Sequence, residues 1–180
     1  MIRQQPEPVA ANFMSTLDQA IGQLNHVMGE VRNFIAGLES HVIQGGDFPT
    51  ALRTMVRTMS SFSQAKCLIR IDEAASRRLS TEQALHIINI VREGLSNALR
   101  HSQATRIVVS LRELVRTIRL TIQDDGIGFN TRSAQGVGHG LGNMAARAQK
   151  VRGSFALRSK PWKGTTILLD LPKDGHYAHN

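Results

Sequence analysis

Three polar residues of complementary chemistry recur at four-residue steps between positions 93 and 101. In a helix, Glu93, Asn97 and His101 would line up on one face, with Arg100 beside them. An amide oxygen is a ligand that Mg²⁺ accepts, and guanidinium and imidazole groups bind phosphate oxygens. The row therefore suits a metal-bound polyphosphate, although a solvated helix face would carry the same residue types.

A second candidate motif, Asp124-Asp125-Gly126-Ile127-Gly128-Phe129, follows a predicted strand directly. Two glycines one residue apart let the backbone turn sharply and let a ligand approach it closely. A carboxylate at the end of a strand can accept a hydrogen bond from an exocyclic amine. An ordinary acidic turn remains the alternative, and Asp125 competes with Asp124 for the binding role.

A third candidate motif is the glycine-rich stretch from Gly136 to Met144, which runs straight into a predicted helix. Free backbone N–H groups at the start of a helix form an anion site. The stretch has no P-loop lysine, and the order of elements around it differs from that of a dinucleotide-binding fold. Alone, it is weak support for phosphate binding.

The order of these motifs is more specific than any one of them. Glu93-x-x-x-Asn97, Asp124-x-Gly126-x-Gly128, Gly138-x-Gly140-Leu141 and a final Gly164-Thr165 before the last strand resemble the GHKL ATPase superfamily. That superfamily joins gyrase, ninety-kilodalton heat-shock chaperones, histidine kinases and mismatch-repair ATPases. Within it, the segment 92–101 resembles the N-box of a sensor histidine kinase subfamily that is usually paired with helix-turn-helix response regulators. The resemblance is strong over about residues 65–172 and weaker over 12–60.

The resemblance implies ATP and Mg²⁺ as ligands and gives each motif residue a role. On the phosphate side, it implies that Asn97 ligates Mg²⁺ and that Glu93 is the acidic N-box residue, acting as a base or orienting water. It places Arg100 and His101 near the phosphates.

On the adenine side, the resemblance implies that Asp124 holds the adenine amine. The other residues that it assigns to the nucleotide either shape the adenine pocket or belong to a phosphate-cradling lid. They are Gly126, Gly128 and Thr165 for the pocket, and Gly138, Gly140 and Leu141 for the lid.

The hydrophobic pattern predicts the elements that position these motifs. A long amphipathic helix is expected over 12–40, and Ser80 with Gln83 forms a capping box that opens a helix over 81–101. The other expected elements are a helix at 50–65, strands at 67–71, 106–111 and 115–122, a mobile loop at 126–142, a helix at 141–151, and a closing hairpin of 154–159 with 165–171.

The expected fold class is α+β, a two-layer α/β sandwich in which one mixed sheet has helices on one face. The resemblance identifies it as a Bergerat-type ATP-binding fold preceded by a long N-terminal helix. The expected division of the chain is a tail at 1–11, a helical region at 12–62 resembling the second dimerisation helix and its connector, a catalytic domain at 63–173, and a tail at 174–180.

Composition narrows the class of protein further. The chain of 180 residues has a formal net charge of +8, but its basic residues are scattered and its aromatic content is 4%, which disfavours nucleic-acid binding. No apolar run reaches the roughly 20 residues that a membrane span needs, so no membrane segment is expected in this chain. The single cysteine, Cys67, is expected to be a structural thiol in a reducing compartment. These features predict a cytoplasmic location, whether or not the full-length protein is anchored in a membrane.

None of the seven histidines is followed by an acidic residue, whereas the phosphoacceptor histidine of such kinases normally is. We therefore expect a fragment of a longer sensor, whose acceptor histidine lies on a separate dimerisation helix. The expected partners are that helix, a response regulator, and a second subunit in a full-length homodimer. The alternatives are an acceptor-less nucleotide-gated module and a serine kinase of the anti-sigma type.

Overall fold

A computed structural model describes residues 47–131 and 139–173. The predicted helix over 12–40, both predicted tails, and the part of the predicted loop that contains Gly138 lie outside the described residues. The predictions for these segments stay predictions.

The central element is helix α4, Thr81–His101, which begins and ends where the sequence predicts. Its capping box is present: the Ser80 hydroxyl accepts from the backbone N–H of Gln83 at 3.1 Å, and the Gln83 side chain accepts from Ser80 N at 3.0 Å. The apolar stripe of α4 is buried against the sheet, and its members include Ala84, Ile88, Val91, Leu95 and Ala98.

Five strands form one mixed sheet in the order β1-β2-β3-β5-β4. Strand β1 (Lys66–Ile71) pairs in parallel with β2 (Arg106–Glu113), and the other neighbours are antiparallel. The remaining strands are β3 (Thr117–Asp124), β4 (Ser154–Ser159) and β5 (Thr165–Pro172). Because β1 and β2 are parallel, the chain must cross over between them, and α4 makes that crossover.

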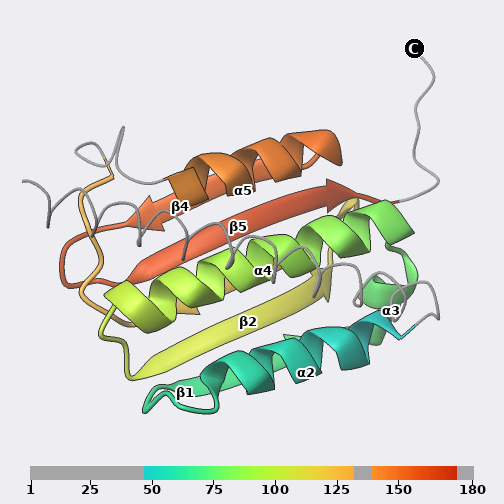
Figure 1. The fold of residues 1–180 in the computed structure, drawn as a ribbon. Coiled ribbons are helices and arrows are strands. Elements are labelled where there is room, and N and C mark those ends of the chain that lie inside the picture. Colours follow the sequence, from blue (N-terminus) through green and yellow to red (C-terminus); the bar gives the residue numbers. More distant parts are fainter. Residues whose placement is uncertain (1–46, 132–138, 174–180) are drawn as a thin grey trace, which may run out of the picture. The chain divides into compact units, whose positions relative to one another are not determined.

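Helices α2 (Phe48–Ser60), α4 and α5 (His139–Lys150) all cover the same face of this sheet (Figure 1). The side chains of β2, β3 and β5 that alternate toward the helices are buried, among them Val109, Leu120 and Leu169. This arrangement confirms the predicted two-layer sandwich with helices on one face.

The structure differs from the predicted elements at several points. Helix α2 begins at Phe48 rather than 50, because Asp47 caps it and Pro49 is tolerated in a first turn, where no backbone N–H is needed. It ends at Ser60, so the predicted continuation to residue 65 is wrong. Helix α5 begins at His139 rather than 141. A five-residue helix, α3 (Glu73–Arg77), was not predicted, since one turn shows no periodicity. Val115, predicted to open a strand, lies instead in the β2–β3 turn and is 93% exposed.

Candidate functional site

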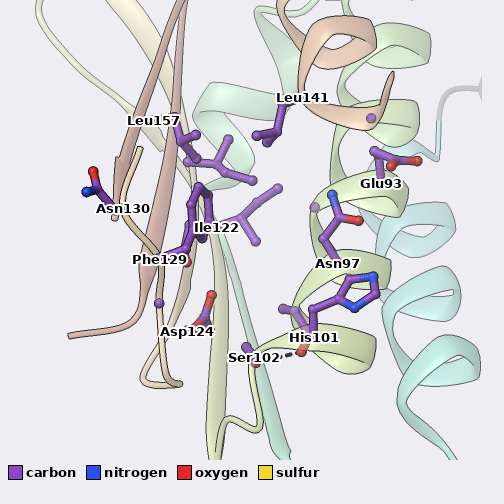
Figure 2. A pocket seen from close by; sticks show the side chains of 16 residues that line it. Glu93, Asn97, His101, Ser102, Ile122, Asp124, Phe129, Asn130, Leu141 and Leu157 are labelled. Atoms are coloured by element: carbon purple, nitrogen blue, oxygen red, sulfur yellow. Dashed lines mark hydrogen bonds between the residues drawn. The ribbon is translucent and has the colours of Figure 1, made fainter. Parts of the chain in front are cut away.

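A pocket of about 510 Å³ opens between α4 and the sheet, at the end where β3 stops and β5 starts. Figure 2 shows its walls: one is formed by side chains of α4, and the facing one by side chains of the strands and the loop after β3. The lining residues are Glu93, Gly94, Asn97, Ala98, His101, Ser102, Ile122, Asp124, Gly128, Phe129, Asn130, Gly140, Leu141, Leu157, Thr165 and Ile167.

The predicted polar row on α4 forms one wall of the pocket. Glu93, Asn97 and His101 all line it, and Figure 2 shows them stacked along the helix. Arg100 is exposed on the same helix and is not among the lining residues. The structure therefore brings together three of the four residues expected at the phosphates.

The same wall carries Gly94, whose role sequence reasoning missed. A Cβ at this position would lie 2.7 Å from Ile122 Cδ1 and 3.1 Å from Ile167 Cδ1. Such contacts are far shorter than the optimum of about 3.5–4.0 Å between carbon atoms. The glycine lets α4 approach the sheet closely, and a buried glycine within a helical pattern was the signal that could have revealed it.

The facing wall is built from successive rows of paired strand residues. Asp124 pairs with Thr165, and two residues further along, on the same face of the sheet, Ile122 pairs with Ile167, which pairs with Leu157. A polar edge therefore stands beside an aliphatic surface. This combination suits a flat heterocycle that buries its faces and presents hydrogen-bonding groups at its rim.

Asp124 is the buried carboxylate of the pocket, with only 7% of its surface exposed. Its Oδ1 accepts from the backbone N–H of Gly126 at 2.9 Å. Burial raises the pKa of the Asp124 carboxyl above its ordinary value, and hydrogen bonds from Gly126 and Thr165 partly oppose that shift. The second carboxylate oxygen is thus a buried acceptor in a position to recognise a donor on a ligand.

Asp125 occupies a different environment, although it is the next residue. It is exposed, and its carboxylate accepts from Thr105 N at 2.8 Å, from Thr105 Oγ1 at 2.7 Å and from Arg106 N at 2.8 Å. These bonds, that from Arg106 first, lower the pKa of Asp125. Asp125 ties the start of β2 to the end of β3 and does not line the pocket, so the geometry favours Asp124 as the recognition residue.

The glycines of the second motif are required by close backbone contacts. A side chain at Gly126 would collide with the carbonyl of Ser102, which also accepts from Ile127 N at 2.7 Å. Gly128 has φ +56°, a left-handed conformation that favours glycine, and it lines the pocket. Gly126 is not among the lining residues, so it shapes the site indirectly.

The start of α5 closes the pocket near Glu93. A Cβ on Gly140 would collide with the Glu93 carboxylate, so the absence of a side chain lets the helix start there. Gly140 and Leu141 both line the pocket, as Thr165 does from β5. Gly138, expected beside them, lies outside the described residues.

Sequence reasoning missed most of the apolar lining, including Ala98, Phe129, Leu157 and Ile167. These residues come from α4, from the loop after β3, and from two strands far along the chain. The pairing of β4 with β5 brings Leu157 beside Ile167, and the packing of α4 on the sheet adds Ala98. No local sequence signal could have revealed this lining.

Comparisons with known proteins identify the family of the chain. The family described as "Histidine kinase-, DNA gyrase B-, and HSP90-like ATPase" matches residues 82–175, more than half of the chain. The chain therefore belongs to this ATPase family. Within it, the chain contains an ATP-binding domain of the kind found in sensor histidine kinases.

The likeness to sensor histidine kinases rests on individual relatives. The Escherichia coli K12 nitrate/nitrite sensor protein NarX is 26% identical over 169 residues, which cover 93% of this chain and 28% of NarX. The Staphylococcus aureus (strain COL) sensor protein VraS is 38% identical over 87 residues, 48% of this chain and 25% of VraS. The chain thus spans little more than a quarter of the length of these relatives.

A solved structure shows the same fold. The Erythrobacter litoralis EL346 blue-light activated histidine kinase superposes with a TM-score of 0.66 at 21% identity, over 86% of this chain and 51% of that one. At this identity the likeness establishes the fold alone.

Residues 47–131 and 139–173 hold neither a cluster of metal-binding side chains nor a membrane-spanning helix. No group of three or more His, Cys, Asp or Glu side chains in this part of the chain is arranged to hold a metal ion. None of the helices described is long and apolar enough to cross a membrane.

Proposed function

We propose that this chain binds ATP with Mg²⁺ in the pocket described above and transfers the γ-phosphoryl group to a histidine outside residues 1–180. The observation that carries the proposal is the pairing of two walls. Glu93 and Asn97 line the pocket from α4, and Asp124 and Thr165 line it from the sheet. Figure 2 shows Asn97 and Asp124 on its two sides. Family membership supports ATP as the nucleotide.

Asp124 recognises the adenine base. Adenine carries an amine donor at its six position, and an ionised carboxylate offers only acceptors, so the two groups match. The aliphatic row of Ile122, Ile167 and Leu157 supports the face of the ring. Guanine presents a carbonyl where adenine has its amine, which would set two acceptors against each other in a buried site.

The phosphates extend along α4 toward Asn97, His101 and Glu93. Since these residues form no dedicated metal cage, Mg²⁺ would be held by the Asn97 amide oxygen together with phosphate oxygens, the usual arrangement for this ion. When bound, Mg²⁺ neutralises charge on the transferring phosphoryl group. Arg100, exposed on the same helix, supplies positive charge close to the phosphates.

In the transfer step, a ring nitrogen of the acceptor histidine forms a bond to the γ-phosphorus. The bond between that phosphorus and the β,γ-bridging oxygen breaks, and ADP leaves. The ring loses its N–H proton, which we assign to the Glu93 carboxylate. This chain contributes chiefly positioning and charge, which is how phosphoryl transfer is generally catalysed.

The acceptor belongs to a separate dimerisation helix in this proposal. None of the seven histidines of this sequence has the acidic follower typical of an acceptor. The same proposal includes a homodimer of the full-length protein, a response regulator that receives the phosphoryl group, and a cytoplasmic location for this domain. The sensor-protein names of the relatives favour it over a nucleotide-gated module or an anti-sigma-type serine kinase.

The test is incubation of this chain with γ-labelled ATP, Mg²⁺ and a dimerisation helix from a sensor histidine kinase. We expect acid-labile, alkali-stable label on the helix, and none when Mg²⁺ is chelated. Bound ATP without any label on the helix would contradict the transfer step. Acid-stable label on a serine would point to the other kinase class.

A further inference from the structure

Three polar side chains form one row across the pocket end of the sheet. Asp124 on β3 pairs with Thr165 on β5, and Thr165 pairs with Ser159 on β4. Paired residues on neighbouring strands project from the same face of a sheet. Asp124 and Thr165 line the pocket, whereas Ser159 is the next residue of the row and is not among the lining residues.

The Ser159 hydroxyl joins three segments of the site. It accepts from the backbone N–H of Phe129 at 2.9 Å, lies 3.0 Å from the carbonyl oxygen of Gly164, and lies 3.0 Å from Thr165 Oγ1. Phe129 lines the pocket, and Gly164 forms the turn into β5 with φ +69°. One half-buried hydroxyl therefore holds the loop after β3 and the start of β5 in register.

The number of hydroxyl hydrogens determines which of these groups donate and which accept. Thr165 is paired directly with Asp124 across the two strands, and it is among the residues that lower the pKa of Asp124. An ionised Asp124 can only accept, so a hydrogen bond between the two side chains has the Thr165 hydroxyl as its donor. Thr165 Oγ1 is then left as an acceptor toward Ser159. Ser159 has a single hydrogen to share between Thr165 Oγ1 and the Gly164 carbonyl, and it satisfies Phe129 N with a lone pair.

We propose that Ser159 is a positioning residue for base recognition: its hydroxyl orients Thr165 toward Asp124 and so sets the preference of the site for adenine over guanine. The inference rests on the proposed function, because it concerns the same nucleotide pocket. It assigns a role to a side chain that does not itself contact the base.

The experiment compares ATP and GTP affinity, each with Mg²⁺, by calorimetry on the wild-type chain and on Ser159→Ala. Losing this hydroxyl leaves Phe129 N and Thr165 Oγ1 short of a partner, so we expect ATP affinity to fall about five- to tenfold and the ATP-over-GTP ratio to narrow by a similar factor. Ser159→Thr keeps the hydroxyl and should restore both values to within about twofold. Ser154→Ala, at the exposed opposite end of the same strand, is the matched control and should change neither.

A second arm separates positioning from mere support of the fold. If Ser159 acts through Thr165 and Asp124, the effect of Ser159→Ala on the ATP-over-GTP ratio should disappear in an Asp124→Asn background. A loss of affinity that is equal for both nucleotides would overturn the inference. If Ser159→Ala fails to fold, Ser159→Cys replaces it, because a thiol has a similar volume but is a poorer hydrogen-bonding group. The ATP-over-GTP ratio should narrow in Ser159→Cys as well. A wild-type chain that binds no ATP would sink the proposed function, whereas ATP binding with an unchanged ratio in the variants would sink this inference alone.

Discussion

Replacing Asp124 with asparagine should weaken ATP binding while keeping the turn at Gly126. The amide oxygen of the new side chain can still accept from Gly126 N, which bonds to the Asp124 carboxylate at 2.9 Å in the structure. Its amide nitrogen then faces the pocket and presents a donor to the adenine amine. Two donors face each other where an acceptor and a donor had matched.

The size of the affinity loss follows from the chemistry of the bond. A hydrogen bond to a charged group contributes about 1.5–3 kcal/mol, so Asp124→Asn should weaken ATP binding about ten- to 150-fold. GTP should lose less, because the guanine carbonyl can accept from the new amide. Calorimetric titration with both nucleotides measures how far the ATP-over-GTP affinity ratio narrows.

The stability of Asp124→Asn relative to wild type should depend on pH. Burial raises the pKa of Asp124, so the ionised form is destabilised in the folded chain relative to the unfolded chain. That cost is present at pH 7 and disappears as the pH falls below the ordinary aspartate pKa of about 3.9. The melting temperature of Asp124→Asn relative to that of wild type should therefore be highest near pH 7 and should fall toward pH 4.

Asp125→Asn is the matched control, one residue away and outside the pocket. Three hydrogen bonds, first that from Arg106, lower the pKa of Asp125. Its stabilising contribution is thus present above the ordinary aspartate pKa and is lost as the pH falls through the depressed pKa. Asp125→Asn should lower the melting temperature at pH 7 and leave the ATP-over-GTP ratio unchanged. A reversal, in which Asp125→Asn abolishes the preference and Asp124→Asn keeps it, would refute the assignment of the motif.

Three further outcomes are expected. Gly94→Val should lower the free energy of unfolding by about 1–3 kcal/mol and reduce ATP binding, because the new Cβ would lie 2.7 Å from Ile122 Cδ1. Urea titration measures the first effect, and unchanged stability would contradict the close helix–sheet approach. Burial, aided by Arg147, lowers the pKa of His86, so below about pH 6.5 the unfolded chain binds more protons than the folded chain and wild-type stability falls. His86→Leu should therefore lose less stability than wild type between about pH 7 and 5. An equal decline in both proteins would argue against this. This chain alone should acquire no stable label from γ-labelled ATP, and acid-labile label on His26 would show that an acceptor is present in the sequence.

The parts of the fold that depend on local signals could be predicted from the sequence. Helix α4 was predictable because Ser80 and Gln83 mark its start and its apolar stripe continues from Ala84 to Ala98. The closing hairpin of β4 and β5 was predictable because two short strand patterns flank a turn at Pro161–Gly164. Helix α3 was not, because its five residues are too few to show a period.

The candidate site divides in the same way. Its polar residues could be found because the Glu93 row, Asp124 and Thr165 stand in motifs with fixed spacing. Its apolar wall could not, since Ile122, Leu157 and Ile167 become neighbours only through strand pairing across about 45 residues of sequence. Ser159 could not be predicted for the same reason. Asp125 could be distinguished from Asp124 only by its hydrogen bonds to Thr105 and Arg106 in the structure.

The most direct test of the central claim is calorimetric titration of ATP into wild-type chain and Asn97→Ala, with Mg²⁺ and with a chelator. If Asn97 supplies an oxygen to Mg²⁺, the variant should lose at least about tenfold in Mg²⁺-dependent affinity, which is about 1.4 kcal/mol. With the chelator, the two proteins should bind ATP equally. Asn89→Ala is the control on the same helix, since Asn89 Nδ2 bonds to Leu85 O at 2.9 Å and does not line the pocket. If this pocket binds Mg²⁺-ATP, ATP affinity should fall only for Asn97→Ala and only in the presence of Mg²⁺. Absence of ATP binding by the wild type, or equal Mg²⁺-ATP affinity in wild type and Asn97→Ala, would contradict it.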